Sequence, residues 1–319
     1  MRAANTSPYG ARMANTISDQ RRRSTQIDPD DHRRRLLDGL PVTERRLVLA
    51  GVSTSVLEGG DGPPVVLLHG PGGWAGHWMQ VLPELVTTHR VVAPDLPDQG
   101  ASYVENGAVD AERIGSWLGE LIDATCATPP VLVGQALGGA IAATYASANP
   151  TRLSALVLVD TLGLRPFEPV PEFGAAIEAF FAQPDAESHD QLWKYCAFDV
   201  DGLRRRMGTV WSTFTGYNVD LARTPAVQSA VFAMLGIFGF PAIDADVLER
   251  IAVPTSLVWG RHDLATPLSV AEEASAKFGW PLYVIDGSAD DPAIEQPEAF
   301  LRVLREVLAK NTGLGEVVS

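Results

Sequence analysis

The sequence predicts an α/β fold with a mostly parallel, doubly wound sheet and one inserted helical segment. Short apolar runs alternate with helix-like stretches along most of the 319 residues, a pattern typical of parallel sheets covered by helices on both faces. The composition, 46% apolar and 20% charged, is that of a globular protein with a sizeable core. Residues 162–245 break the alternation, because their sequence is helix-like and contains no buried strand.

The order of elements divides the chain into a tail, a core and an insertion. Residues 1–40 are polar and are expected to form a disordered or charged tail, with a short helix near residues 30–37. The core is expected to comprise residues 41–161 and 246–319. Its strands are predicted at 46–50, 53–57, 65–68, 90–93, 131–134, 156–159, 255–259 and 282–285. Its helices are predicted near 77–87, 110–125, 137–148, 267–278 and 297–309.

The insertion, residues 162–245, is rich in aromatic residues and is predicted to be a helical cap. Most of its aromatic side chains are expected to form the cap's own core. Trp193 and Trp211 are candidates for lining an apolar pocket beneath the cap, which would bind a small hydrophobic molecule. The stretch from Val231 to Phe240 is apolar enough to support a homodimer through the cap, which size-exclusion chromatography would test.

Charge and cysteine content narrow the function classes. The net charge of −14 argues against nucleic-acid binding, because phosphate contacts need clustered Lys and Arg. Cys126 and Cys196 form neither a disulfide framework nor a metal-type spacing, so free thiols and no metal or cofactor are predicted. No apolar run is long enough to span a bilayer, and we predict a cytoplasmic protein without a membrane partner. Arg carries nearly all the positive charge, a bias common in high-GC bacterial genomes.

Three motifs follow predicted strands in a recognisable order. They are His69-Gly70-Pro71-Gly72-Gly73, Asp95-Leu96-Pro97-Asp98-Gln99-Gly100-Ala101-Ser102, and Trp259-Gly260-Arg261-His262-Asp263. They resemble the oxyanion loop, the DLPGHGxS segment and the WGxxD acid motif of the α/β-hydrolase fold superfamily, in its capped esterase and C–C hydrolase-like branch. The resemblance covers about residues 46–309, and it implies a pocket with a Ser-His-Asp triad.

Two of the three triad positions hold other residues. The segment Gly134–Gly139 resembles the nucleophile elbow G-x-S-x-G, with Ala136 at the nucleophile position. A methyl group cannot attack a carbonyl, so an acyl-enzyme on this residue is excluded. Asp290 stands where the family's histidine is expected, and Asp263 remains as the acid. The paired loss favours natural divergence over a laboratory nucleophile knockout.

What remains of the site allows two interpretations. The elbow would aim the Leu137 amide at the pocket and Gly72 or Gly73 would supply a second donor, which keeps an oxyanion hole without a nucleophile. Alternatively, the elbow glycines persist only because the tight turn needs small residues. Asp290 and Asp263 would be neighbours, so one carboxyl would stay protonated and serve as a general acid. Alternatively, Asp290 faces solvent or caps a turn.

The other polar residues near the predicted pocket have weaker assignments. His69 is expected at the mouth of the pocket and, by the resemblance, holds the oxyanion loop through hydrogen bonds. Gln135 would orient a ligand or face away from it. His77 and His262 are expected at the pocket rim as alternative bases.

Three functional hypotheses stay open. The first is an enzyme that acts noncovalently on a small hydrophobic carbonyl compound, as a lyase, isomerase, cyclase or water-activating hydrolase. The second is a noncatalytic pseudoenzyme that binds a hydrophobic small molecule. The third is a partner-binding subunit. The first is favoured because proteins with this fold are mostly enzymes, which is an argument by analogy.

Overall fold

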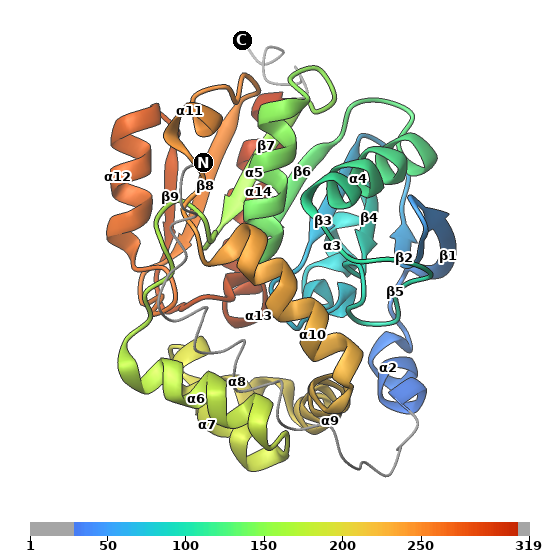
Figure 1. Cartoon of the computed structure of the whole chain (residues 1–319), viewed down its shortest axis with the longest axis vertical. Coiled ribbons are helices and arrows are strands. Elements are labelled where there is room, and N and C mark those ends of the chain that lie inside the picture. The colour runs from blue at the N-terminus through green and yellow to red at the C-terminus, as the bar shows by residue number, and fades with distance from the viewer. Residues whose placement is uncertain (1–28, 312–319) are drawn as a thin grey trace.

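The computed structural model describes residues 29–311, and a nine-stranded, mostly parallel sheet runs through this part of the chain (Figure 1). The sheet order is β1-β2-β4-β3-β6-β7-β8-β9, and β5 pairs with β2. Pairing is parallel from β4 through β9 and antiparallel wherever β2 takes part. The strands are β1 Thr43–Leu49, β2 Val52–Gly59, β3 Pro64–Leu68, β4 Arg90–Pro94, β5 Tyr103–Val104, β6 Val131–Gln135, β7 Ala155–Val159, β8 Thr255–Gly260 and β9 Leu282–Ile285. The predicted α/β class is confirmed.

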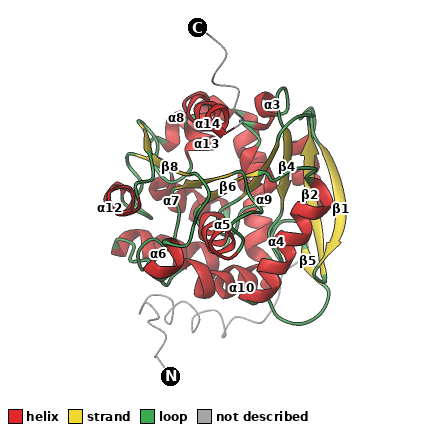
Figure 2. Cartoon of the chain, turned by 90° about the horizontal axis from the view of Figure 1, so that it is seen from above, coloured by secondary structure: helices red, strands yellow, loops and turns green. Residues whose placement is uncertain are grey.

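Helices cover both faces of the sheet, as Figure 2 shows from above. The central strands β3, β6 and β7 are buried along their whole length, which explains why they are continuous apolar runs. Helices α4 (Ala111–Thr125), α5 (Leu137–Ala148) and α12 (Leu268–Phe278) contribute to the core of one face. Helices α3 (Leu82–Leu85) and α14 (Pro297–Asn311) contribute to the core of the other.

One predicted core helix is wrong. The stretch 77–87 contains a short 3-10 helix η1, Ala75–Trp78, and the separate short helix α3. Pro83 lies in the first turn of α3, the position where a proline without its N–H is tolerated, and it would break a helix that ran through it. The short strand β5 and the short helices α11 (Ala245–Leu248) and α13 (Pro292–Glu295) were not predicted.

The segment between β7 and β8 forms the helices that stand at one end of the sheet (Figure 1). They are α6 Pro171–Ala182, α7 Ala186–Cys196, α8 Val200–Met207, α9 Thr209–Arg223, α10 Pro225–Met234 and the π-helical turn η2 Leu235–Gly239. We refer to α6 through η2 as the cap helices. Val231, Met234 and Phe238 are buried within the chain, so the apolar stretch that suggested a homodimer serves internal packing. The homodimer stays an untested prediction.

No single described helix is both long and apolar enough to cross a membrane. Helix α9 and the α10–η2 segment reach the length and apolar composition of a membrane-spanning helix only when they are taken together, and an 84° bend separates them. Within this pair, Phe214, Tyr217 and Val231 are almost completely buried. Their apolar character therefore fits packing inside the chain.

Helix α2, Pro29–Leu37, joins the N-terminal segment to the cap helices. It contacts α9, and the His32 ring lies 2.8 Å from the Asp220 carboxylate of that helix. The expected tail, residues 1–40, therefore contains an ordered helix near the predicted position, while residues 1–28 lie outside the described part of the chain. The helix also carries Arg33, a guanidinium that is only 4% exposed.

Candidate active site

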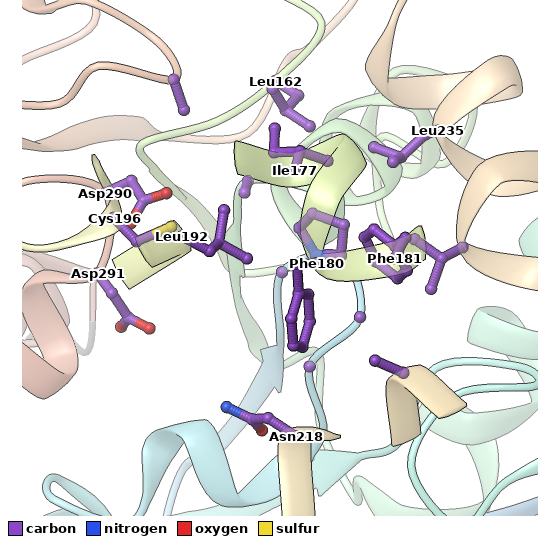
Figure 3. A pocket seen from close by; sticks show the side chains of 18 of the residues that line it. Leu162, Ile177, Phe180, Phe181, Leu192, Cys196, Asn218, Leu235, Asp290 and Asp291 are labelled. Atoms are coloured by element: carbon purple, nitrogen blue, oxygen red, sulfur yellow. The ribbon is translucent and has the colours of Figure 1, made fainter. Parts of the chain in front are cut away.

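A cavity of about 180 Å³ lies between the cap helices and the loops that follow β3, β6 and β9. Most of its wall is apolar (Figure 3). The larger apolar side chains belong to Leu162, Phe167, Phe173, Ile177, Phe180, Phe181, Leu192, Trp193, Val227, Val231, Phe232, Leu235 and Phe240, and the smaller ones to Pro71, Ala136, Ala222 and Ala265. The polar side chains belong to His77, Gln135, His189, Cys196, Asn218, Asp290 and Asp291.

Ala136 occupies the sharp turn between β6 and α5. Its backbone has φ 47° and ψ −110°, a conformation that residues with a Cβ rarely adopt and that costs of the order of 1–3 kcal/mol. The turn aims the residue into the cavity, where Ala136 presents only a methyl group. The geometry of a nucleophile elbow is therefore present around a side chain that has no nucleophilic atom.

Steric fit explains the glycines around this turn. A Cβ on Gly134 would lie 2.4 Å from the Gly138 carbonyl oxygen, and one on Gly138 would lie 2.5 Å from the Leu68 carbonyl oxygen. A Cβ on Gly139 would lie 2.1 Å from Thr161 Oγ1. These positions need glycine for packing alone, so their presence carries no information about catalysis.

The second oxyanion donor predicted from the 69–73 loop is wrong, because both candidate amides are already occupied. The Gly72 N–H donates to Gln99 Oε1 at 2.8 Å, and the Gly73 N–H donates to the Gly70 carbonyl at 3.3 Å. Leu137 is the first residue of α5, so its amide has no acceptor within that helix. The site therefore offers this one elbow amide without the expected partner from the loop.

His69 and Gln135 hold the loops of the site together. His69 is fully buried outside the cavity wall, with Nδ1 2.7 Å from the Gly70 carbonyl and Nε2 accepting from the Leu96 N–H at 3.0 Å. Burial lowers the pKa of His69 to about 4, so the ring is neutral. Gln135 accepts from the Gly70 N–H and donates to the Asp290 carbonyl at 2.8 Å. His69 therefore holds the loop through hydrogen bonds, as the resemblance implied, and it does not line the cavity as a ligand contact would. Gln135 lines the cavity with its amide oxygen and its amide nitrogen already bonded.

Asp263 lies beneath the cavity and does not line it. Its carboxylate accepts from the Ala265 and Thr266 amides at 2.7 and 3.0 Å and from the Thr266 hydroxyl at 2.5 Å. Burial raises the pKa of Asp263 to about 6, partly offset by these hydrogen bonds. Burial and the charge of Asp263 also raise the pKa of Asp160, whose Oδ2 is buried without a hydrogen-bond partner. Asp263 is therefore a buried support for the site.

Asp290 and Asp291 supply the acidic groups of the cavity wall. Figure 3 shows their side chains with that of Cys196 at one side of the cavity. Burial raises the pKa of Asp290 well above its usual range, and the charges of Asp263 and Asp291 raise it further. Burial and the charge of Glu295 act in the same direction on the pKa of Asp291. Burial likewise raises the pKa of the Cys196 thiol, which therefore stays protonated at neutral pH.

The remaining predicted residues divide between the cavity and the surface. Trp193 lines the cavity, whereas Trp211 packs behind it with ring centroids 5.2 Å apart, so Trp211 is wrong as a ligand contact. His77 lines the cavity, and burial lowers its pKa to about 3. His262 is exposed and stacks on Phe198, so its prediction as a base in the pocket is wrong.

Sequence reasoning gave no pocket role to four polar residues of the cavity wall, which are His189, Cys196, Asn218 and Asp291. His189 of α7 and Asn218 of α9 contact one another at 3.2 Å. Each stands in a helical segment of mixed polar and apolar sequence without any motif. Only the packing of α7 against α9 brings them together.

Comparison with known proteins assigns the fold family. The model of the alpha/beta hydrolase fold family matches residues 63–297. The chain belongs to the α/β-hydrolase fold family. A 2-hydroxy-6-oxo-2,4-heptadienoate hydrolase of Pseudomonas putida is 28% identical over 280 residues, covering 83% of this chain and 96% of the relative. A pimeloyl-acyl-carrier-protein methyl ester esterase of Chromobacterium violaceum is 28% identical over 254 residues, covering 78% and 95%.

Solved α/β-hydrolase fold structures are similar over nearly the same span. A meta-cleavage product hydrolase of Pseudomonas fluorescens, complexed with acetates, has a TM-score of 0.71 at 24% identity and covers 85% of this chain and 99% of its own. Naproxen esterase of Bacillus subtilis has a TM-score of 0.74 at 17% identity and covers 89% and 100%. This α/β-hydrolase fold protein therefore has hydrolases as relatives, and these structural likenesses establish the shared fold.

No metal site is apparent in the part of this α/β-hydrolase fold protein that the structure describes. Across residues 29–311, no group of three or more His, Cys, Asp or Glu side chains is placed so that it could hold a metal ion. Two acidic groups near the cavity are bonded to backbone amides and hydroxyls: Asp263 accepts from the Ala265 and Thr266 amides, and Glu295 Oε1 accepts from the Ala289 N–H at 2.6 Å.

The raised pKa values of two buried acids predict a contribution to the stability of this α/β-hydrolase fold protein that is lost as pH rises. Burial raises the pKa of Glu295 to about 7 and that of Asp263 to about 6. The folded state keeps protons that the unfolded chain releases near pH 4–4.5, so this contribution is lost between about pH 4 and about pH 7. Burial lowers the pKa of His69 to about 4 and that of His77 and His189 to about 3, and these rings contribute in the opposite direction. Between pH 5.5 and 8 the Glu295 contribution falls by about 2 kcal/mol, which corresponds to about 4 °C in the unfolding midpoint.

Thermal unfolding followed by circular dichroism tests this pH dependence. Relative to Glu295→Gln, the wild-type midpoint is expected to fall by about 4 °C from pH 5.5 to 8, whereas relative to Glu306→Gln, at an exposed position on α14, it is expected not to change. A difference between wild type and Glu295→Gln that stays constant over this pH range would contradict the expected contribution of Glu295.

Proposed function

We propose that the cavity catalyses proton transfer on a small apolar carbonyl compound without a covalent acyl intermediate. The observation that carries the proposal is the combination of Ala136 at the elbow with the Asp290 carboxyl in the same cavity. Among the described residues that line the cavity, none has a hydroxyl group, and its cysteine is a protonated thiol. Groups that can move a proton are present, whereas an activated nucleophile is not.

Asp290 and Asp291 are proposed to act as an acid and base pair. Burial raises the pKa of both carboxyls, and the charge of Asp291 raises that of Asp290 further, so the proposal places the proton on Asp290 and the charge on Asp291. In the proposed step, protonated Asp290 gives its proton to the substrate carbonyl oxygen while the Asp291 carboxylate takes a proton from the α carbon. The C–H electron pair forms the C=C bond of the enol, and the carbonyl π pair binds the new O–H proton.

The activities of two relatives support a carbonyl substrate. The Pseudomonas putida relative acts on an oxo compound, and the Chromobacterium violaceum relative acts on a methyl ester. The cavity volume of about 180 Å³ is slightly larger than an engineered apolar cavity of about 150 Å³ that binds benzene. A compound with one aromatic ring and a short side chain therefore fits the proposed substrate class.

Hydrogen–deuterium exchange at the α carbon of acetophenone tests the proposal. In deuterated buffer, wild-type protein is expected to accelerate loss of the methyl proton signal in the NMR spectrum. Asp290→Asn is expected to reduce that rate about 100-fold, because it removes the proton donor. Asp286→Asn is the matched control, since Asp286 is exposed and pairs with Arg261. Exchange that proceeds equally in wild type and Asp290→Asn would refute the role of Asp290.

A second candidate function is ligand binding without turnover. It is favoured by the occupied amides of Gly72 and Gly73, because the loop then offers no donor to a developing oxyanion. Saturable binding of acetophenone without α-proton exchange would support this candidate over the first. Turnover of any ester in a p-nitrophenyl ester panel would not support it.

A further inference from the structure

Asn218 is a buried polar side chain with an unsatisfied atom in a wall of apolar residues. It is 8% exposed, and its Oδ1 has no hydrogen-bond partner. The other end of its amide, Nδ2, lies 3.2 Å from Nε2 of His189. Figure 3 shows Asn218 near Phe180, on a different side of the cavity from Asp290 and Asp291. A buried unpaired acceptor carries a free-energy cost, which a ligand donor would relieve.

His189 fixes the orientation of this amide. Its ring is 1% exposed and packs against Phe180, Trp193, Trp211 and Phe214, with ring centroids 5.7 to 6.3 Å apart. Nδ1 has no hydrogen-bond partner and lies 4.0 Å from the Asp190 carboxylate, whose charge favours the tautomer with its proton on Nδ1. Nε2 then accepts from the Asn218 Nδ2–H, and Oδ1 is the atom left free for a ligand.

The charges around the cavity favour an uncharged ligand over a carboxylate. No Lys or Arg is among the described residues that line it, and two aspartates are. Burial lowers the pKa of His189 and of His77 to about 3, so neither ring supplies a positive charge at neutral pH. A carboxylate would therefore lose its hydration in this cavity without meeting a cation. The dienoate named for the Pseudomonas putida relative is such a carboxylate.

We propose that Asn218, positioned by His189, forms a hydrogen-bonding subsite for a hydroxyl group of an uncharged ligand, and that the cavity rejects carboxylates. This inference names the ligand class of the pocket to which the proposed function assigns proton transfer. It concerns binding alone, so it stands or falls separately from the role of Asp290.

Benzyl alcohol, toluene and benzoate form a matched set of probes, because they share one ring and differ in the polar group. Their dissociation constants are measured by tryptophan fluorescence, since Trp193 lines the cavity. The ratio of the toluene constant to the benzyl alcohol constant reports the contribution of the hydroxyl group. It removes effects that a variant has on both ligands equally, such as a change in cavity volume.

Asn218→Leu is expected to lower this ratio about threefold to tenfold, as expected for one lost hydrogen bond. His189→Phe keeps a ring in the aromatic cluster and is expected to lower the ratio less, because the amide loses only its orientation. Asn149→Leu is the matched control, since Asn149 caps α5 outside the cavity, and its ratio should equal that of the wild type. Benzoate is expected to bind wild type at least tenfold more weakly than benzyl alcohol.

Each outcome decides the proposal. A lower ratio in Asn218→Leu, with the control unchanged, supports the subsite even if no variant shows any turnover. If Asn218→Leu fails to fold, as judged by thermal unfolding, the ratio in His189→Phe decides instead. An unchanged ratio in the folded variants, or benzoate binding as tight as that of benzyl alcohol, overturns the proposal whatever the result of the acetophenone exchange experiment.

Discussion

An Ala136→Ser, Asp290→His double variant is expected to react with a fluorophosphonate probe and to hydrolyse p-nitrophenyl esters, whereas the wild-type chain is expected to do neither. The elbow already holds residue 136 at φ 47° and ψ −110°, facing the cavity that residue 290 also lines. The oxygen nucleophile and its base are absent, and the loop amides of Gly72 and Gly73 are occupied. The Asp263 carboxylate acts electrostatically on residue 290, so it is placed to stabilise an imidazolium there.

The expected gain follows from two opposing effects. Loss of the serine or histidine of a working triad costs on the order of 10⁶ in rate. The occupied Gly72 amide costs the restored site one oxyanion donor, worth on the order of 10² to 10³. We therefore expect ester hydrolysis about 10³-fold above the wild-type level, measured as p-nitrophenolate release.

A histidine placed one residue away supplies the control for this restoration. Ala136→Ser with Asp291→His keeps the same composition and the same cavity, but the imidazole starts from a different backbone position. It is expected to stay close to the wild-type level. Labelling of the wild-type chain itself would show that another residue is the nucleophile and that Ala136 does not mark the missing one.

Arg33→Ala is expected to destabilise the fold by about 3–5 kcal/mol, because it leaves a buried carboxylate without its cation. Arg33 Nη1 lies 2.9 Å from Asp95 Oδ2, and these side chains are 5% and 0% exposed. The same guanidinium donates to the Tyr217 hydroxyl at 3.1 Å and to Ser55 Oγ at 3.1 Å. It therefore connects α2 to the sheet and to cap helix α9.

The electrostatic environment of Asp95 explains why removal of Arg33 destabilises the fold. Burial raises the pKa of Asp95, and Arg33 opposes that rise together with the amides of Ala101 and Ala75. Without the guanidinium, Asp95 must either stay charged and unpaired or take up a proton and weaken its bonds to the amides. Those bonds, at 2.7 Å each, hold the start of η1 and the loop that follows β4.

Arg34→Ala is the matched control for Arg33→Ala on the same helix. The Arg34 side chain is 79% exposed and pairs with Asp31, so its loss is expected to change stability by no more than about 0.5 kcal/mol. Chemical denaturation at neutral pH measures both variants. If both variants lost the same unfolding free energy, Arg33 would contribute only as a helical residue. Its buried ion pair and hydrogen bonds would then add no net stability.

Local sequence was sufficient to predict most strands of the sheet and the sharp turn at Ala136. The apolar runs at 131–134 and 156–159 became β6 and β7 because strands buried on both faces must be apolar throughout. The glycines around Ala136 predicted the turn because no other residue fits so close to neighbouring backbone. These requirements act over a short range, so they restrict the residue types at those positions and can be read from the sequence. The helix predicted at 77–87 was wrong, although Pro83 was visible in the sequence.

The roles of the site residues depended on contacts between distant segments. Gly72 was expected to donate to an oxyanion, but Gln99, 27 residues later, accepts its N–H. Asn218 and His189 gave no sequence signal, since a polar residue on an apolar helix gains a role only from the surface against which the helix packs. The sequence placed Arg33 in a predicted tail. In the structure, α2 packs on α9, and the Arg33 guanidinium pairs with Asp95.

The sequence by itself determined the α/β class and the order of the motifs along the chain, and it predicts that Ala136 and Asp290 stand at two triad positions. Backbone propensity, burial and steric fit act within a few residues, so they can be inferred from the local amino-acid sequence. Only the tertiary structure decided which amides are free, which carboxyls face the cavity and which polar atoms lack a partner. Hydrogen bonding and desolvation depend on whatever lies within a few ångströms in space, and residues separated by more than 100 positions, such as Gln135 and Asp290, meet there.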